Sequence, residues 1–202
     1  SGTFTMGSMS LELGRDADEA QREVTLSSHY WMADTEVTRA QWLRIMATEP
    51  WPKSERITSL DVPASNMTQG QAREFCVELT KIEREAGRLP QGFGYMLPSE
   101  AQFACRASST SAHCYEPGKE QLADYAVFGQ SSFDRVAQRK ENKNGLFDMH
   151  GNVAEWCVDT VGVGEGRNVV SKLLLNTNPV SVLGALASYR GGSYNSPQQD
   201  CR

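Results

Sequence analysis

The stretch FDMHGNVAEW, residues 147–156, does most to indicate the fold and the chemistry of this chain. Asp148 and Glu155 are hard oxygen donors separated by a turn that contains glycine, and such a turn can direct the backbone carbonyls of Gly151 and Val153 at one point. Carboxylate and carbonyl oxygens are the ligands that calcium prefers. The stretch therefore predicts a calcium site formed by Asp148, Gly151, Val153 and Glu155.

The same residues also fit structural roles that need no metal. Asp148 can cap a turn, and Glu155 can pair with an arginine such as Arg190, because loop-rich cores often use buried carboxylates in this way. We expect Asn152 to support the turn through hydrogen bonds between its side chain and the backbone. We expect His150 to face solvent rather than to bind a metal.

The segment YRGGSYNSPQQDCR, residues 189–202, is the second informative stretch. Gly191 and Gly192 suit a tight backbone turn, and Arg190 suits a buried ion pair or a loop anchor. The side chains around this turn offer hydroxyl, amide and aromatic groups of the kind used in adaptable polar recognition. The ligand cleft predicted here consists of Arg190, Ser193, Tyr194, Asn195 and Ser196, with Trp156 supporting it from within. The alternative is a hydrated loop without a ligand.

Upstream of these stretches, three segments have the pattern of helices with N-terminal caps. The first runs from Thr38 to Met46 and is followed by Pro50 and Pro52. The second runs from Thr68 to Gly87, with Gln71 at the capping-box position and an apolar stripe of Ala72, Phe75, Leu79 and Ile82. The third runs from Ser99 to about Ala107, with Phe103 facing inward.

Residues 2–8 and 23–38 alternate as half-buried strands do, and we expect them to form an antiparallel pair. In the second run the apolar positions are Val24, Leu26, Tyr30 and Met32. Beyond Ser108 there is no long periodic run, so the rest of the chain is predicted to consist of loops and short strands. The fold class predicted from these elements is α+β with little regular secondary structure.

The 202 residues are expected to form a single domain over residues 1–202. With 20 Lys and Arg against 25 Asp and Glu, the net charge of −5 argues against nucleic acid as a partner. No apolar run approaches the roughly 20 residues that cross a bilayer, so we predict no membrane span.

Five cysteines are present and none belongs to a C-x-x-C pair, which argues against a zinc or redox site. Cys105 and Cys114 are close enough in sequence for a short-loop disulfide in an oxidising compartment, or both are buried thiols.

Six segments in order resemble the signatures of the formylglycine-generating enzyme, or sulfatase-modifying factor, family. They are GTFTMGS, HYWMADTEVTRAQW, VPASNMTQGQAREFC, MLPSEAQFACRA, NKNGLFDMHGNVAEW and YRGGSYNSPQQDCR. The resemblance implies an irregular variant of the C-type lectin fold. In the family, the positions that match Asp148, Gly151, Val153 and Glu155 hold calcium, and family domains continue past the last of these segments into closing strands, which are expected to be missing from this chain.

The resemblance also bears on catalysis. Formylglycine-generating oxidases bind copper(I) through two cysteines in C-x4-C spacing, and here the second position is Cys201 but the first is Ser196. A hydroxyl cannot replace a thiolate as a ligand for copper(I), so we do not expect copper. Cys201 is a weak candidate for catalysis and is expected to be a core thiol or a disulfide partner. The tryptophan common in the family's Asn-Val-Trp-Glu-Trp motif is Ala154 here, which changes the wall of the cleft.

Iron chemistry, known for sulfoxide synthases of the family, has little support in the sequence. Those members bind iron through three histidines, whereas His29, His113 and His150 are widely spaced and stand in unrelated contexts.

We therefore expect a ligand-binding or accessory domain with a protein, peptide or small molecule as its unknown partner, in the periplasm or outside the cell. The alternative is an oxidative enzyme of the same family acting on a peptide or a small molecule.

Overall fold

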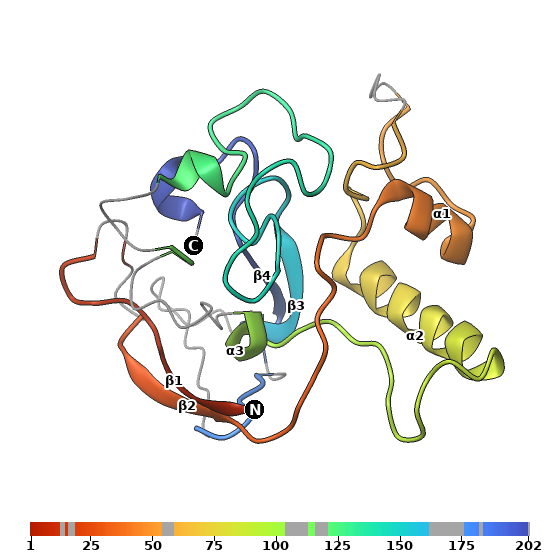
Figure 1. Ribbon diagram of the computed structural model, residues 1–202, viewed down its shortest axis with the longest axis horizontal. Coiled ribbons are helices and arrows are strands. Elements are labelled where there is room, and N and C mark those ends of the chain that lie inside the picture. Colours follow the sequence, from red (N-terminus) through yellow and green to blue (C-terminus); the bar gives the residue numbers. More distant parts are fainter. Residues whose placement is uncertain are drawn as a thin grey trace.

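The structure is a computed structural model, and it describes residues 1–12, 15, 19–53, 59–103, 113–115, 121–161, 176–181 and 184–201. The helices and strands are short, and loops make up most of the described chain (Figure 1). The order of elements is β1 (Gly2–Met6), β2 (Arg22–Leu26), α1 (Arg39–Met46), α2 (Gln69–Glu85), α3 (Glu100–Phe103), β3 (Glu155–Val161) and β4 (Leu186–Arg190), with 3-10 turns at Leu122–Asp124 and Gln198–Asp200. The prediction of an irregular α+β fold is confirmed.

Strands β1 and β2 form the expected antiparallel pair, in a register from Gly2 opposite Leu26 to Met6 opposite Arg22. Val24 and Leu26 are buried, as their place in the alternation predicts. The prediction of a strand as far as residue 38 is wrong, because β1 offers only five residues for pairing. The later part of the alternating run is instead a loop that leads to α1.

Helices α1 and α2 begin where their sequences predict. Thr38 and Thr68 each accept a hydrogen bond from the backbone N–H three residues later, and Gln41 and Gln71 complete the two capping boxes. Helix α1 ends at Met46 because Ala47 adopts a left-handed conformation, with φ of 51°, before either proline is reached.

Helix α2 buries less of its predicted stripe than expected. The ring of Phe75 stacks on that of Trp42 in α1, with 5.4 Å between the ring centroids, and Leu79 packs against the same cluster. Ile82, however, is exposed. Helix α1 is only about 12 Å long against about 26 Å for α2, so its cover does not extend to the last turns of α2.

Helix α3 has the predicted cap, since Ser99 Oγ accepts a hydrogen bond of 3.2 Å from the Gln102 N–H. Phe103 is buried, as predicted. The part of the predicted helix that follows Phe103 lies outside the described residues.

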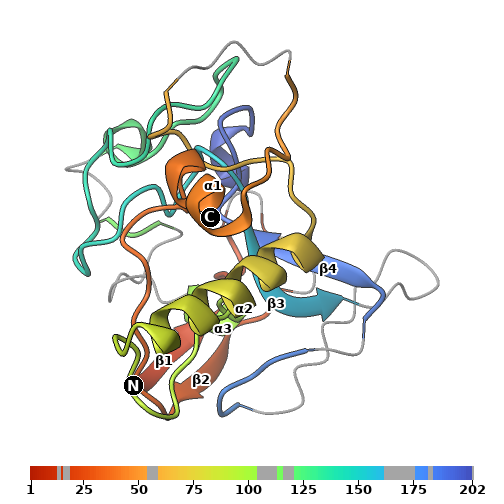
Figure 2. The ribbon, with the colours of Figure 1, turned by 90° about the vertical axis from the view of Figure 1, so that its right-hand side faces the viewer.

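Strands β3 and β4 form a second antiparallel pair near the middle of the molecule, and α2 meets β3 at its first turns and then runs past it in front of α3 (Figures 1 and 2). Two hydrogen bonds from side chains in the first turns of α2 join this helix to β3. Gln69 Nε2 donates to the Cys157 carbonyl at 2.6 Å, and the guanidinium of Arg73 donates to the Val158 carbonyl at 2.7 Å. Among the described residues, no helix is long and apolar enough to cross a membrane.

Candidate functional site

The turn around Asp148 and the loop after Arg190 lie against each other. The Gly151 N–H donates to the Gly191 carbonyl at 2.7 Å, and the Tyr194 N–H donates to the Asn152 carbonyl at 2.8 Å. These two backbone hydrogen bonds join segments about 40 residues apart into one surface.

A third segment, residues 127–130, completes this arrangement. Its Val127 carbonyl accepts from the Asn152 N–H at 2.8 Å, and its Gln130 N–H donates to the Tyr194 carbonyl at 2.6 Å. Gly151 has a φ of 85°, and a Cβ atom at this position would collide with the Val127 carbonyl. Only glycine therefore allows the turn to approach this segment so closely.

Asn152 is the hub of the turn. It is fully buried, with a φ of 52° that asparagine tolerates better than most residues. Its Nδ2 donates to Glu36 Oε1 at 3.0 Å, and its Oδ1 accepts from the Asp134 N–H at 3.0 Å. The expectation that Asn152 supports the turn rather than a substrate is consistent with these contacts.

Two of the predicted calcium ligands, Asp148 and Glu155, form an acidic group with a third carboxyl, that of Glu36. Asp148 is 2% exposed, and its Oδ2 accepts from the Ala137 N–H at 2.7 Å. Its Oδ1 and the Oε2 of the buried Glu36 have no hydrogen-bond partner among the described residues. Buried carboxylate oxygens without partners destabilise a fold unless a proton or a cation is present.

The pKa values of all three carboxyl groups are raised. Burial raises the pKa of Asp148, and burial together with the charges of Asp148 and Glu155 raises the pKa of Glu36. Burial and the charge of Asp148 raise the pKa of Glu155 to about 7. The charge of Asp148 thus makes both Glu36 and Glu155 harder to ionise, and a divalent cation would stabilise buried carboxylates in this environment.

These residues fit calcium by charge and by donor type. Among the described residues, however, no three His, Cys, Asp or Glu side chains gather as a metal-binding group. A calcium ion here would therefore combine carboxylates with backbone carbonyls, as the sequence predicts. Glu36 was not predicted, although the alternation that starts at Val24 and Leu26 places it on the apolar face of the run.

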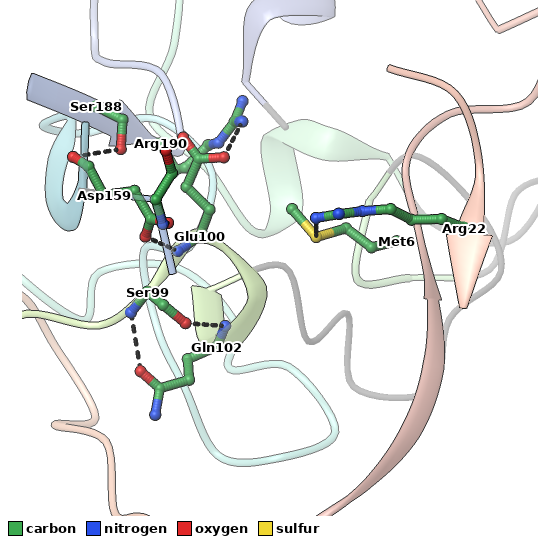
Figure 3. A network of polar contacts seen from close by, with 9 residues as sticks. Met6, Arg22, Ser99, Glu100, Gln102, Asp159, Ser188 and Arg190 are labelled. Atoms are coloured by element: carbon green, nitrogen blue, oxygen red, sulfur yellow. Dashed lines mark hydrogen bonds and ion pairs between the residues drawn. The ribbon is translucent and has the colours of Figure 1, made fainter. Parts of the chain in front are cut away.

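The alternative pairing of Glu155 with Arg190 is wrong. The two residues are opposite each other in the β3–β4 register, yet the Arg190 guanidinium binds Glu100 Oε2 at 2.8 Å (Figure 3). Arg190 therefore forms an ion pair, as one of the two expectations for it has it, but only the partner, Glu100 of α3, is buried, and the Arg190 side chain is 40% exposed.

This ion pair belongs to a polar network that holds α3 against β3 and β4 (Figure 3). The carboxylate of Asp159 accepts the Glu100 and Ser181 N–H groups, each at 2.8 Å. The Asp159 carbonyl accepts the Ser188 hydroxyl at 3.2 Å. Arg190 is therefore engaged in holding the elements beneath the loop together.

Hydrogen bonds among its own residues hold the loop after Arg190 in a tight turn. Ser196 Oγ accepts from the Ser193 N–H at 3.0 Å, and the Ser196 N–H donates to the Ser193 carbonyl at 2.9 Å. The Ser193 hydroxyl donates to Asn195 Oδ1 at 2.7 Å. The side chain of Ser196, at the position of the family's first copper-binding cysteine, thus stabilises a tight turn.

Cys201 is a fully buried thiol that packs with Tyr115, Leu122 and Tyr125. Burial, with a smaller contribution from Asp200, raises the pKa of this thiol to about 11. It is therefore protonated at neutral pH and is a poor nucleophile and metal ligand. Gly192 has a φ of 70°, and a Cβ atom there would lie 3.0 Å from the Cys201 sulfur.

The remaining cleft residues differ in exposure. Asn195 is exposed, whereas Tyr194 is half-buried, with its ring edge-on to that of Phe133 at 5.8 Å. Trp156 is also half-buried, and its Nε1 donates to the Met67 carbonyl at 3.0 Å, at the start of α2. Its indole also contacts Tyr189, so these contacts lie outside the loop that Trp156 was expected to support.

The histidine predictions need correction. His150 is buried rather than exposed, because residues 113–115 pack against the turn, and its Nε2 accepts from the Cys114 N–H at 3.1 Å. The rings of His113 and His150 are in edge contact, with 5.2 Å between their centroids, although the two residues are far apart in sequence. His29 lies at the surface beside Ser1.

Cys105 lies outside the described residues, so the disulfide with Cys114 stays a prediction.

Comparisons with known proteins agree with this architecture. A family model described as "Sulfatase-modifying factor enzyme 1-like domain" (FGE-sulfatase) matches residues 1–202. A curated relative, the serine/threonine-protein kinase pkn1 of Chlamydia pneumoniae, is 32% identical over 110 residues, which make up 54% of this chain and 17% of the kinase. The chain thus spans less than a fifth of that protein.

Three solved structures have similar folds. PvdO from Pseudomonas aeruginosa matches with a TM-score of 0.79 at 22% identity, over 100% of this chain and 82% of PvdO. Treponema denticola variable protein 1 matches with a TM-score of 0.68 at 21% identity, over 99% of this chain and 85% of that protein. CarF matches with a TM-score of 0.56 at 18% identity, over 99% and 89%. At these identities the similarity shows the fold alone.

Proposed function

The chain belongs to the FGE-sulfatase family of sulfatase-modifying factor enzyme 1-like domains, and on this premise we propose that it is a calcium-stabilised binding or accessory domain rather than a copper-dependent formylglycine oxidase. The observation that carries this proposal is the state of the two positions where the oxidases hold copper. Ser196 is committed to a hydrogen-bonded turn, and Cys201 is a buried, protonated thiol. Copper(I) requires soft sulfur ligands, and this pair offers one at most.

Calcium has a structural role in the proposal. Asp148 and Glu155, with the carbonyls of Gly151 and Val153, would hold the ion, and Glu36 would add negative charge beside it. The support is the buried Asp148 Oδ1 that lacks a hydrogen-bond partner among the described residues. The ion would neutralise the acidic group and fix the turn against the loop after Arg190.

The recognition surface proposed for this domain is the loop after Arg190. Asn195 and the following residues 197–200 are exposed, while Tyr194 is half-buried. Because Arg190 and Ser196 are engaged in internal contacts, ligand contacts would come chiefly from Tyr194, Asn195 and the Ser193 hydroxyl. Ala154, also exposed, leaves room beside this surface where other family members have tryptophan.

The match to a small part of a much longer kinase supports the proposal that this chain is an accessory domain. It indicates that a segment similar to this chain occurs within a larger protein. Neither the kinase activity nor the substrates of that protein are assigned to this chain.

The deciding experiment offers the purified protein a sulfatase-type Cys-x-Pro-x-Arg peptide together with copper(I) and oxygen. We expect no loss of the peptide thiol and no aldehyde by mass spectrometry. Turnover by the unmodified protein would overturn the proposal in favour of the oxidative enzyme.

A matched pair of variants tests the reason for this result. Ser196→Cys restores the C-x4-C spacing with Cys201, whereas Ser193→Cys adds a thiol to the same loop at the wrong spacing. Competition with a chromogenic copper(I) chelator should show tighter copper(I) binding for Ser196→Cys than for Ser193→Cys. Equal binding by the two variants would contradict the role assigned to Ser196.

A further inference from the structure

An open groove of about 440 Å³ lies between α2 and the chain that follows it; Figure 2 shows α2 crossing the face turned to the viewer. Gly94 and Tyr95, in the segment after the helix, form its other wall. The groove is lined by Val77, Thr80, Lys81, Arg84, Glu85, Gly94 and Tyr95. None of these residues belongs to the turn around Asp148 or to the loop after Arg190.

The groove is held in shape by two hydrogen bonds between its walls. The Tyr95 N–H donates to Thr80 Oγ1 at 2.8 Å, and the Arg84 guanidinium donates to the Phe93 carbonyl at 3.0 Å. Gly94 lies between them, and a Cβ atom added there would reach ordinary contact distance from Thr80, 3.6 Å. The absence of a side chain at Gly94 therefore leaves the groove open.

The apolar residues in and beside the groove are unusually exposed. Val77 is 62% and Tyr95 46% exposed, and Met96, next to Tyr95, is 69% exposed. Trp31, 79% exposed, packs against Phe93 with 5.2 Å between the ring centroids. Exposed tryptophan and tyrosine side chains are enriched among the residues that supply most of the binding energy of protein interfaces.

The charges of the lining determine which partner fits. Lys81 and Arg84 are cations and Glu85 is the one acidic residue of the lining, so the groove is net positive on a chain with a net charge of −5. Lys81 Nζ pairs with Glu78 Oε2 at 4.0 Å, and both side chains are exposed. A surface ion pair of this kind contributes little to the stability of the fold. Lys81 can therefore exchange Glu78 for a carboxylate of a ligand with little loss of free energy.

We propose that this groove binds a peptide segment of a partner protein in which an apolar side chain is flanked by carboxylates. The apolar side chain lies between Val77 and Tyr95, and the carboxylates meet Lys81 and Arg84. The groove is open to solvent rather than enclosed, which suits a peptide better than a small molecule that needs an enclosing pocket. Two cations are fewer than the cluster of basic residues that anionic membranes attract.

The test is selection of random 12-residue peptides displayed on phage against the immobilised protein. We expect the enriched sequences to share an aromatic or aliphatic residue flanked by Asp or Glu. The affinity of one enriched peptide, measured by fluorescence polarisation, should fall at least tenfold with Lys81→Glu and with Val77→Ser, and should fall with rising salt.

Gly94→Leu supplies a second, independent variant. It fills the groove without removing any hydrogen bond that shapes it, and it should abolish binding while the circular dichroism spectrum is unchanged. Lys53→Glu makes the same charge change on an exposed residue outside the groove and should leave the affinity within twofold.

Three results would overturn the proposal. The first is a selection that enriches no acidic, apolar sequence, and the second is an enriched peptide whose affinity is indifferent to Val77, Lys81 and Gly94. The third is reversible self-association by analytical ultracentrifugation that Gly94→Leu abolishes, because the groove would then be occupied by a second copy of the chain. None of these results depends on calcium or on the loop after Arg190, so they are distinct from a failure of the proposed function.

Discussion

The Nδ2 of Asn152 donates a hydrogen bond of 3.0 Å to Oε1 of Glu36, a residue 116 positions earlier in the chain. Both side chains are buried. This contact joins the loop that leads into α1 to the turn that carries the candidate calcium ligands. The position of Glu36 beside Asp148 therefore depends on Asn152.

Replacing Asn152 with alanine should destabilise the fold strongly. It removes the hydrogen bonds to Glu36 and to the Asp134 N–H, and it places alanine at a φ of 52°. Each buried polar group left unpaired costs about 1–3 kcal/mol, and the left-handed conformation adds about 1 kcal/mol. We expect a loss of about 3–7 kcal/mol in urea unfolding.

The control for this variant is Asn144→Ala, on an exposed turn nearby. It should change the free energy of unfolding by less than about 0.5 kcal/mol. Equal effects of the two substitutions would show that Asn152 is not the hub of the turn.

Removal of calcium should loosen the fold. A ligand that binds only the folded state stabilises it by about 2.7 kcal/mol at a hundredfold excess over its Kd, so EGTA should lower the melting temperature. Asp148→Asn should remove this sensitivity to calcium. An unchanged melting curve in EGTA, with no calcium found by elemental analysis, would remove the ion from the proposal.

The metal-free protein should become less stable as the pH rises. Glu155 has a pKa of about 7 in the folded state, above that of an unfolded glutamate, so folding favours the protonated form. This stability is fully present below the unfolded pKa and is lost as the pH rises through 7. In EGTA, we expect unfolding at pH 8 to need about 2 kcal/mol less than at pH 5.5.

Two comparisons test the origin of this pH dependence. Glu155→Gln, which cannot ionise, should reduce the difference between pH 5.5 and pH 8. Stabilisation by added calcium should be larger at pH 8, because protons compete with the metal for the carboxylates. If the difference between the two pH values is the same in Glu155→Gln, another group is responsible.

Tyr194→Ala and Asn195→Ala should differ in their effect on the free energy of unfolding. Tyr194→Ala removes a half-buried ring that contacts Phe133 and should cost about 1–2 kcal/mol, while Tyr194→Phe keeps the ring and should cost less. Asn195→Ala, on the exposed part of the loop, should stay within about 0.5 kcal/mol of the unmodified protein. Chemical denaturation gives these values, and a larger loss for Asn195→Ala than for Tyr194→Ala would contradict the packing described here.

The sequence by itself predicted the features that depend on neighbouring residues. The caps at Thr38, Thr68 and Ser99 use a hydrogen bond to a residue three positions later, so a short stretch contains all the information. The same holds for the turn at Gly191 and Gly192, where a positive φ favours glycine. The ordered segments predicted the family in the same way, since each is contiguous.

The tertiary structure alone decided which distant side chains meet. Glu36 joins Asp148, Arg190 binds Glu100 rather than Glu155, and the rings of His113 and His150 touch, although no local pattern connects these pairs. Ile82 is exposed because the short α1 does not cover the end of α2. These outcomes depend on how loops cross in space, and the alternation of polar and apolar residues records only whether a side chain faces inward, not which partner it finds there.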